Sequence, residues 1–443
     1  MTGRCPFASR RGFLGGAAGG ALAALARTAP ARADDVAAHG ISTEGQGAGR
    51  AVTEPFHGPH QAGILTAQQN HTYFAAFDLV GTDRGAVEAM LRRWTEIAER
   101  LTRGETAAPL DGVKTDIAAP DSGEALGMAA ARLTLTFGFG AGLFSKDGKD
   151  RFGLAARRPE ALVDMPEFNG DQLEEARTGG DLSVQACADD PQVAFHAVRQ
   201  LARAAGDTAR LRWTQTGFNA NFAAEDTPRN LMGFKDGTQN PIAERPHERV
   251  GGVTLPNPLS PDKVVWASPD GPAWMSGGTY LVTRRIRMAI EHWDSTDVEF
   301  QELTIGRHKY SGAPLGETDE FAPLDFDKVD AEGMPVIPDN AHVRLAASVF
   351  NDGAEILRRA YSYNDGTNVI AERWPPWRQG LEYDAGLMFI CYQSDPRTGF
   401  IKIFEPMAKL DALNQYTTHT GSGLFACPPG VRPGEFIGQA LFA

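Results

Sequence analysis

The sequence repeats one strand-and-helix pattern twice, and this repeat constrains the fold more than any other feature. An apolar, β-favouring run at 73–80 comes before apolar residues at helical spacing over 87–101, with Asp83 in the N-cap position. A second strand pattern at 279–290 comes before another helical stretch, which we expect to open at Asp294. The chain is therefore predicted to contain two related halves.

Each half also has a later strand that ends in an Asp-Pro pair, Asp190-Pro191 or Asp395-Pro396. Asp suits a helix N-cap and Pro suits the first helical turn, so each pair predicts a helix start. Alternating runs at 133–137 and 209–216 add strands to the first half. The pattern favours an α+β fold of two tandem ferredoxin-like halves with antiparallel sheets, similar to a dimeric α/β barrel. A doubly wound α/β fold is the alternative, but the sequence has no GxGxxG or P-loop turn.

The repeat divides the chain into five predicted segments. Residues 1–33 are expected to be a signal peptide, and residues 34–70 a loosely packed N-terminal arm. The first ferredoxin-like half is assigned to 71–225, and a connecting segment with a GxxDG motif to 226–278. The second half is assigned to 279–443.

The first segment has the three parts of an export signal in order. Arg10-Arg11 is followed by a Gly/Ala-rich apolar run to Ala26, and Ala31-Arg32-Ala33 provides small residues for cleavage. The arginine pair is typical of a twin-arginine signal, which is an address rather than an anchor. The segment is also too short and too weakly apolar to span a bilayer permanently. We therefore expect a periplasmic or extracellular protein without membrane anchoring.

Charge and cysteine content narrow the function classes. The formal net charge of −13 argues against nucleic acid and anionic membranes as partners. The cysteines at 5, 187, 391 and 427 are scattered, and none forms a CxxC pair that could hold zinc or an iron–sulfur cluster. Their flanks are apolar, so buried free thiols are expected after Cys5 is removed with the signal.

Three short motifs contain the residues that could carry chemistry. The first is Gly233-Phe234-Lys235-Asp236-Gly237-Thr238, the second is His342 before Val-Arg-Leu-Ala, and the third is Leu357-Arg358-Arg359-Ala-Tyr-Ser-Tyr. Each motif alone has an ordinary structural explanation, because GxxDG is a common turn, a single His is more often structural, and an Arg pair is usually solvated.

In combination, these motifs resemble the dye-decolourising (DyP-type) peroxidase family. The signal and the stretch Gly306-Arg307…Gly312-Ala313-Pro314-Leu315-Gly316 resemble its twin-arginine-exported branch, which includes the periplasmic deferrochelatase/peroxidase of bacterial iron uptake. The resemblance begins at Pro55 and covers nearly the whole mature chain. It implies one haem b per chain, held mainly by the second half.

The implied activity is reduction of hydrogen peroxide to water through a ferryl intermediate, with oxidation of dyes, phenols and other small or bulky organic reductants. Two alternatives stay open. One is a deferrochelatase that releases iron from haem, and the other is a non-enzymatic haem carrier. A homo-oligomer is compatible with the sequence.

The resemblance also implies roles for individual residues. His342 matches the axial ligand of the haem iron, Asp236 the distal acid–base, and Arg358 the distal guanidinium, which would also contact the haem. Haem iron needs a basic axial donor that leaves the opposite face open. A carboxylate can move the protons of peroxide, and a guanidinium stabilises charge on the departing oxygen. Arg359 is interpreted as structural or as a propionate partner.

Further expectations concern the surroundings of these groups. Gly237, Thr238 and Gln239 follow the distal acid and are expected to pass the haem edge, and Arg287 is a predicted propionate partner. An axial histidine normally donates its other N–H to an acceptor, for which Asp384 is the candidate. Bulky dyes cannot reach a buried haem, so a tyrosine or tryptophan radical is predicted, with these candidates by residue type: Trp213, Tyr361, Tyr363, Tyr383, Tyr392 and Tyr416.

Overall fold

The computed structural model describes residues 52–111, 114, 116–219, 227–241, 246–250, 253–256, 261–371 and 379–443. The predicted signal peptide and the first part of the predicted arm lie outside the described residues. In the described part of the chain, no helix combines the length and apolar character needed to cross a membrane.

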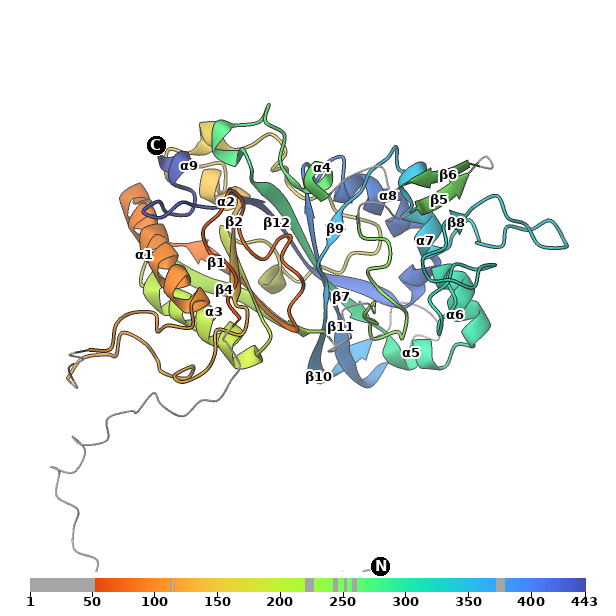
Figure 1. Cartoon of the computed structure of the whole chain (residues 1–443), viewed down its shortest axis with the longest axis horizontal. Helices are drawn as coiled ribbons and strands as arrows, with labels where there is room; N and C mark the ends of the chain where they lie inside the picture. The colour runs from red at the N-terminus through yellow and green to blue at the C-terminus, as the bar shows by residue number, and fades with distance from the viewer. Residues whose placement is uncertain are drawn as a thin grey trace, which may run out of the picture. The chain divides into compact units, whose positions relative to one another are not determined.

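The first half is a four-stranded antiparallel sheet with two long helices on one face. Its strands are ordered β4-β1-β3-β2, which is the ferredoxin-like order. Figure 1 shows α1 and α3 side by side along the outer face of this sheet. The elements are β1 (His71–Leu79), α1 (Arg84–Thr102), β2 (Thr134–Gly140), α2 (Ala141–Phe144), β3 (Leu182–Ala188), α3 (Pro191–Ala205) and β4 (Ala209–Phe218).

Both helix starts predicted for this half are confirmed. The Asp83 carboxylate accepts the backbone N–H of Ala86 at the start of α1. Asp190 accepts the N–H groups of Gln192 and Val193, with Pro191 in the first turn of α3. Because the caps satisfy N–H groups that have no partner within a helix, they fix where each helix begins.

The second half repeats this topology in the order β12-β7-β11-β10, so the predicted duplication is confirmed. β9 pairs with β11 beyond the end of β10, as a short continuation of the same edge. The elements are β7 (Thr279–Met288), α5 (Ile290–Asp294), α6 (Val298–Ile305), α7 (His342–Leu345), β9 (Leu357–Arg358), β10 (Tyr361–Ala371), β11 (Gln379–Gln393), α8 (Phe400–Leu410), β12 (Thr417–Cys427) and α9 (Gln439–Phe442).

The helix starts predicted for the second half are wrong by several residues. Asp294 is the last residue of α5, and the N-cap of α6 is Asp297, whose side chain accepts the N–H of Phe300. Asp395 does not cap a helix either. It binds the backbone and guanidinium of Arg397 in a turn, and α8 begins only at Phe400.

The two sheets join into a closed barrel. β2 pairs with β12 through Phe139↔Ala426, and β4 pairs with β10 through Phe218↔Ser362. The interior is filled by large side chains from both halves, including Phe74, Trp213, Tyr363, Met388, Tyr392 and Phe425. The α+β fold with two ferredoxin-like halves is therefore confirmed, and these positions of the barrel interior are occupied by packed side chains.

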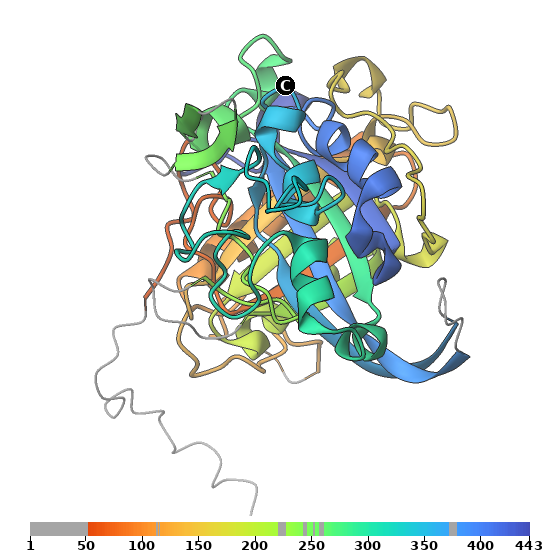
Figure 2. The same ribbon diagram turned by 90° about the vertical axis from the view of Figure 1, so that its right-hand side faces the viewer.

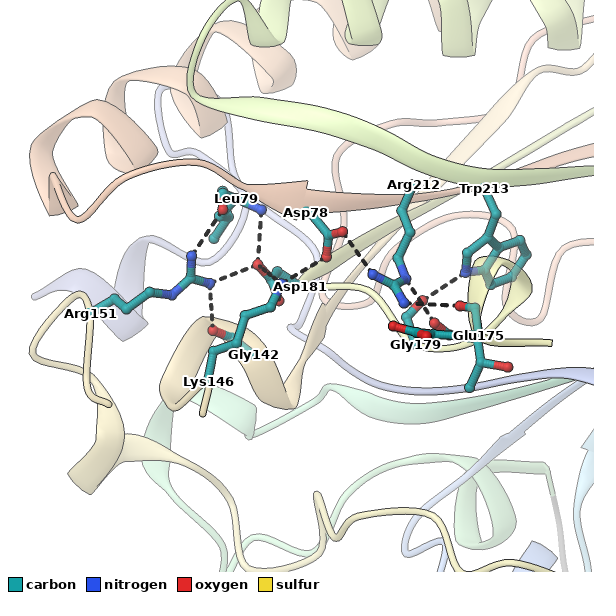
Figure 3. A network of polar contacts seen from close by, with 11 residues as sticks. Asp78, Leu79, Gly142, Lys146, Arg151, Glu175, Gly179, Asp181, Arg212 and Trp213 are labelled. Atoms are coloured by element: carbon teal, nitrogen blue, oxygen red, sulfur yellow. Dashed lines mark hydrogen bonds and ion pairs between the residues drawn. The ribbon is translucent and has the colours of Figure 1, made fainter. Parts of the chain in front are cut away.

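Polar contacts tie the end of the first sheet to the loops that follow it (Figure 3). The buried Asp181 carboxylate accepts the N–H of Leu79 and forms ion pairs with Lys146 and Arg151. The Trp213 indole N–H donates to the carbonyl of Gly179 at 2.7 Å. Trp213 is thereby held as a packing residue of the barrel.

The part of the predicted arm that the structure describes is well packed, which contradicts the expectation of a loose segment. The buried Gln61 side chain donates to the carbonyls of Phe137 and Pro428, and so joins β2 to the chain after β12. Ile64 and Gln69 are also buried. Three of the cysteines, Cys187, Cys391 and Cys427, are free and buried as predicted.

Outside the barrel, short elements stand in front of the second sheet. Figure 2 shows α8 and the helices around it covering this face. A three-stranded sheet in the order β6-β5-β8 lies beside them. Its strands are β5 (Pro246–Val250), β6 (Val253–Pro256) and β8 (Leu324–Asp325), and α4 is Pro261–Val265.

Candidate active site

A cavity lies between the outer face of the second sheet and the helices that cover it. β7 contributes Ile286 and Met288 to its wall, and β11 contributes Leu387 and Phe389. Side chains alternate between the two faces of a strand, so these residues share one face while their neighbours point to the other. With Met407 from α8, they form an apolar wall that suits a flat apolar ligand.

His342 faces this cavity from the first position of α7. Its Nδ1 donates to Oδ2 of Asp411 at 2.7 Å. Asp411 lies between α8 and a 3-10 turn, and its other oxygen accepts the N–H of Leu413 at 2.8 Å. Among the described residues, Nε2 of His342 has no hydrogen-bond partner, and the ring keeps 34% of its surface accessible. The ring is therefore held through one nitrogen and offers the other to the cavity.

The Asp411 carboxylate also shifts the pKa of His342. Burial lowers the pKa of the ring, but the Asp411 carboxylate raises it more, so the net pKa is above its ordinary value. An imidazole that donates from Nδ1 to a carboxylate has a fixed tautomer and an electron-rich Nε2. This is the arrangement expected of a metal-binding histidine.

Asp236 and Arg358 also line the cavity and form an ion pair. Nη1 of Arg358 donates to Oδ1 of Asp236 at 2.9 Å. The Asn240 amide fixes the backbone of Arg358 twice, because its Nδ2 donates to the Arg358 carbonyl at 2.9 Å and its Oδ1 accepts the Arg358 N–H at 3.1 Å. Oδ2 of Asp236 has no partner among the described residues. It is therefore available to a ligand.

Glu320 anchors the loop on either side of Asp236. It forms an ion pair with Lys235, and its Oε1 accepts the hydroxyl of Thr238 at 3.0 Å and that of Thr227 at 2.5 Å. Burial raises the pKa of Glu320, but these donors lower it by a larger amount. The net pKa is therefore below its ordinary value, and the carboxylate is charged. Gly237, Thr238 and Gln239 line the cavity, and their expected passage along a haem edge stays a prediction.

Arg307 provides a further cation in the cavity, and the sequence assigned it no role. Its side chain is 3% exposed, and Nη1 donates to the carbonyls of Gly312 and Glu320. Nη2 is buried without a hydrogen-bond partner. Burial and the repulsion of Arg358 outweigh the attraction of Glu320 and lower the pKa of Arg307 to about 10, which still leaves it cationic. A buried, unpaired guanidinium nitrogen is a ready site for an anion.

The predictions for Asp384 and Arg287 are wrong. Asp384 lies within β11 and forms an ion pair with Arg285 at 2.7 Å, so it does not hold His342. Arg287 forms an ion pair with Glu382 at 2.6 Å and does not line the cavity. Strand alternation explains both results, because the cavity-facing residues Ile286 and Leu387 belong to the opposite face of the sheet.

Arg359 and most of the predicted aromatic relays are packing residues. Arg359 is buried and donates to Gln69 and to the carbonyl of Thr66, away from the cavity lining. Five of the six aromatic candidates are buried, namely Trp213, Tyr361, Tyr363, Tyr392 and Tyr416. Tyr383 is 49% exposed. The radical itself stays a prediction.

Similarity to known proteins agrees with this arrangement. A dye-decolorizing peroxidase from Thermobifida fusca is 41% identical over 369 residues, which cover 81% of this chain and 76% of that protein. A deferrochelatase from Escherichia coli (strain K12) is 35% identical over 406 residues, which cover 88% of this chain and 87% of that protein. The solved structure of ferric DtpA from Streptomyces lividans matches with a TM-score of 0.76 and 39% identity, covering 89% of this chain and 98% of that one.

The family models cover both halves of the described chain. The model of the N-terminal part of the Dyp-type peroxidases matches residues 61–219, and the model of the C-terminal part matches residues 227–432. Each match spans one ferredoxin-like half, and the second includes Asp236, His342 and Arg358. The chain therefore belongs to the Dyp-type peroxidase family.

Proposed function

We propose that this chain is a haem b peroxidase that reduces hydrogen peroxide to water while oxidising organic reductants. The observation that carries the proposal is the presence of two polar pairs, His342–Asp411 and Asp236–Arg358, in the lining of one apolar cavity. A peroxidase needs an axial base and a proton-transfer group with a fixed cation.

The residues of the cavity fit a haem. The apolar faces of β7, β11 and α8 suit a porphyrin, and Nε2 of His342 is the free nitrogen that would hold its iron. The unpaired Nη2 of Arg307 suits a propionate oxygen. When bound, haem supplies the iron that takes up peroxide and the electrons that break the O–O bond.

On the proximal side, Asp411 keeps the Nδ1 proton of His342 in place. The 2.7 Å hydrogen bond fixes the ring orientation and keeps a proton on Nδ1, so Nε2 is the nitrogen that would bind the metal. Because Asp411 is itself held by the N–H of Leu413, the carboxylate does not have to reorganise when a ligand arrives. This side of the cavity would therefore set the electron density at Nε2 of His342.

On the distal side, Asp236 moves the protons. Its free Oδ2 would take a proton from one oxygen of peroxide and give a proton to the other, which departs as water. Arg358 stabilises the charge that builds on the departing oxygen and keeps its own proton. Overall, two electrons from reductants and two protons would convert one hydrogen peroxide into two waters.

Rapid mixing of the haem-loaded protein with peroxide tests these roles. Asp236→Asn or Arg358→Leu should slow the spectral change by at least about 10²-fold for whichever group dominates. Asp384→Asn is the matched control, because it removes an ion-paired carboxylate that lies outside the cavity lining. Equal rates in the wild type and both distal variants would contradict the proposal and favour a haem carrier.

Release of iron from haem is the second candidate function. Its support is the similarity to proteins named deferrochelatase, one of which is 34% identical over 98% of this chain. Incubating the protein with haem and measuring porphyrin fluorescence distinguishes the two functions. Free porphyrin without peroxide consumption would favour the deferrochelatase. Peroxide consumption with the haem intact would favour the peroxidase.

We also propose export by the twin-arginine route to a periplasm or the outside of the cell. Arg10-Arg11, the apolar run and Ala31-Arg32-Ala33 support this proposal. Mass spectrometry of the exported protein should find a new N-terminus after Ala33. Replacing both arginines by lysine should retain the full-length precursor in the cell, and continued export of that variant would contradict the proposal.

A further inference from the structure

The cavity contains a carboxyl group that the proposed mechanism does not use. Glu355 lies on the segment between α7 and β9 and lines the same cavity as His342 and Arg358. Both of its carboxyl oxygens are buried, and neither has a hydrogen-bond partner among the described residues. Burying such a group without a partner is costly, so it needs an explanation in a ligand or a function.

Glu355 has a second acid, Glu248, as its neighbour, and the hydrogen bonds of the two carboxyl groups show which of them carries a proton. Glu248 on β5 is 2% exposed, and its oxygens accept the N–H of Ser348 at 2.7 Å and the N–H of Val349 at 3.0 Å. The hydroxyl of Ser348 adds a further hydrogen bond at 3.2 Å. Three donors stabilise the charged form of Glu248, whereas Glu355 has none, so the proton of this pair belongs to Glu355.

The charge around Glu355 agrees with this assignment. Burial, and then the repulsion of Glu248, raise the pKa of Glu355 to about 7. Glu248 on β5 is the charged neighbour that shifts it, and the other ionisable groups that line the cavity are Lys235, Asp236, Arg307, His342, Arg358, Asp411 and His419. At and below neutral pH, Glu355 is therefore a hydrogen-bond donor in the cavity wall.

We propose that Glu355 is a ligand-binding residue whose protonated carboxyl donates a hydrogen bond to a carboxylate of the bound ligand, namely a propionate of haem b. This inference rests on the proposed function as a haem protein. When Glu355 is protonated, it and the propionate share one proton and attract each other. When Glu355 is ionised, the propionate meets a second negative charge beside that of Glu248 and is repelled. Haem should therefore be held more tightly when Glu355 is protonated. The structure thus assigns this protein a haem affinity that falls as the pH rises through neutrality.

Haem transfer to excess apomyoglobin measures this effect without recourse to activity. At one pH unit above the pKa of Glu355, the wild type should lose haem about tenfold faster than at one unit below it, which corresponds to about 1.4 kcal/mol. Glu355→Gln should show little change between these pH values, because its amide donates a hydrogen bond and does not titrate. Glu355→Leu should lose haem quickly at both. Glu317→Gln, at a carboxylate paired with Lys328 outside the cavity lining, is the matched control.

A second ligand isolates the propionate. With the dimethyl ester of hemin, which has no carboxylates, wild type and Glu355→Leu should release the ligand at the same rate. A defect of Glu355→Leu that persists with the ester would overturn the inference, as would equal pH dependence in the wild type and Glu355→Gln. Protein that binds no haem at all would instead contradict the proposed function, so the two failures are distinguishable.

Discussion

Replacing Asp411 by Asn tests the hydrogen bond behind His342. The substitution removes one charge and keeps the size of the side chain and an oxygen for the N–H of Leu413. The carboxylate is 4% exposed, so solvent screens its interaction with Nδ1 very little. A hydrogen bond to a charged group contributes about 1.5–3 kcal/mol. Removing such a partner of a metal-binding histidine lowers the metal affinity about 10–100-fold, which corresponds to about 1.4–2.8 kcal/mol. The two ranges agree.

The same free energy can be expressed as a reduction potential. A buried negative charge behind the axial imidazole favours the more positive, ferric state of the iron. A tenfold change in a one-electron equilibrium corresponds to about 59 mV, so Asp411→Asn should raise the potential of the bound haem by up to about 60–120 mV, the limit reached when the whole effect falls on the ferric state. The direction is fixed by the sign of the charge that is removed.

Spectroelectrochemical titration of the haem-loaded protein measures this potential. Asp384→Asn is the control. Asp384, on β11, is also an ion-paired carboxylate, but its partner is Arg285 and not His342. Its potential should match that of the wild type. An unchanged potential in Asp411→Asn, or a larger shift in Asp384→Asn than in Asp411→Asn, would refute the reasoning.

Three further outcomes follow for the haem-free protein. Trp94→Ala should lower the free energy of unfolding by about 3–5 kcal/mol in urea titrations, because Trp94 lies on the buried face of α1 and packs into the core. Burial, and then the Arg284 cation, hold the pKa of His419 well below its usual 6.5, so its stability contribution is present above that value and is lost as the pH falls below it. Between neutral and mildly acidic pH, His419→Gln should therefore lose less stability than the wild type, by up to about 1.4 kcal/mol per pH unit. Burial raises the pKa of the Cys391 and Cys427 thiols, so thiol reagents should label them only after unfolding, as mass spectrometry can show.

The fold could be predicted because its signals are local and occur twice. Strand alternation and the caps at Asp83 and Asp190 depend on a few neighbouring residues, and the structure has them as predicted. The same residue types gave a wrong prediction in the second half. There, Asp395 binds Arg397 within a turn and does not start a helix. An Asp-Pro pair is thus compatible with a cap or a turn, and the side chain that competes for the carboxylate decides between them.

The proximal acid could not be found in this way. Asp411 and His342 are 69 residues apart, and their contact depends on how α7 packs beside α8. The sequence favoured Asp384 because it comes before a run of buried residues, but alternation along β11 places it on the face opposite Leu387, where it pairs with Arg285. A shift of one residue along a strand reverses the face that a side chain occupies.

The groups that sequence analysis missed share a physical property rather than a motif. Arg307 and Glu355 both have buried polar atoms without a partner, and both line the cavity. In a folded protein such groups are exceptions, because leaving a buried donor or acceptor unpaired costs about 1–3 kcal/mol. One is a cation and the other a neutral acid, so both attract a carboxylate. One ligand with carboxylates would explain both unpaired groups, and a haem, with its two propionates, is a ligand of that kind.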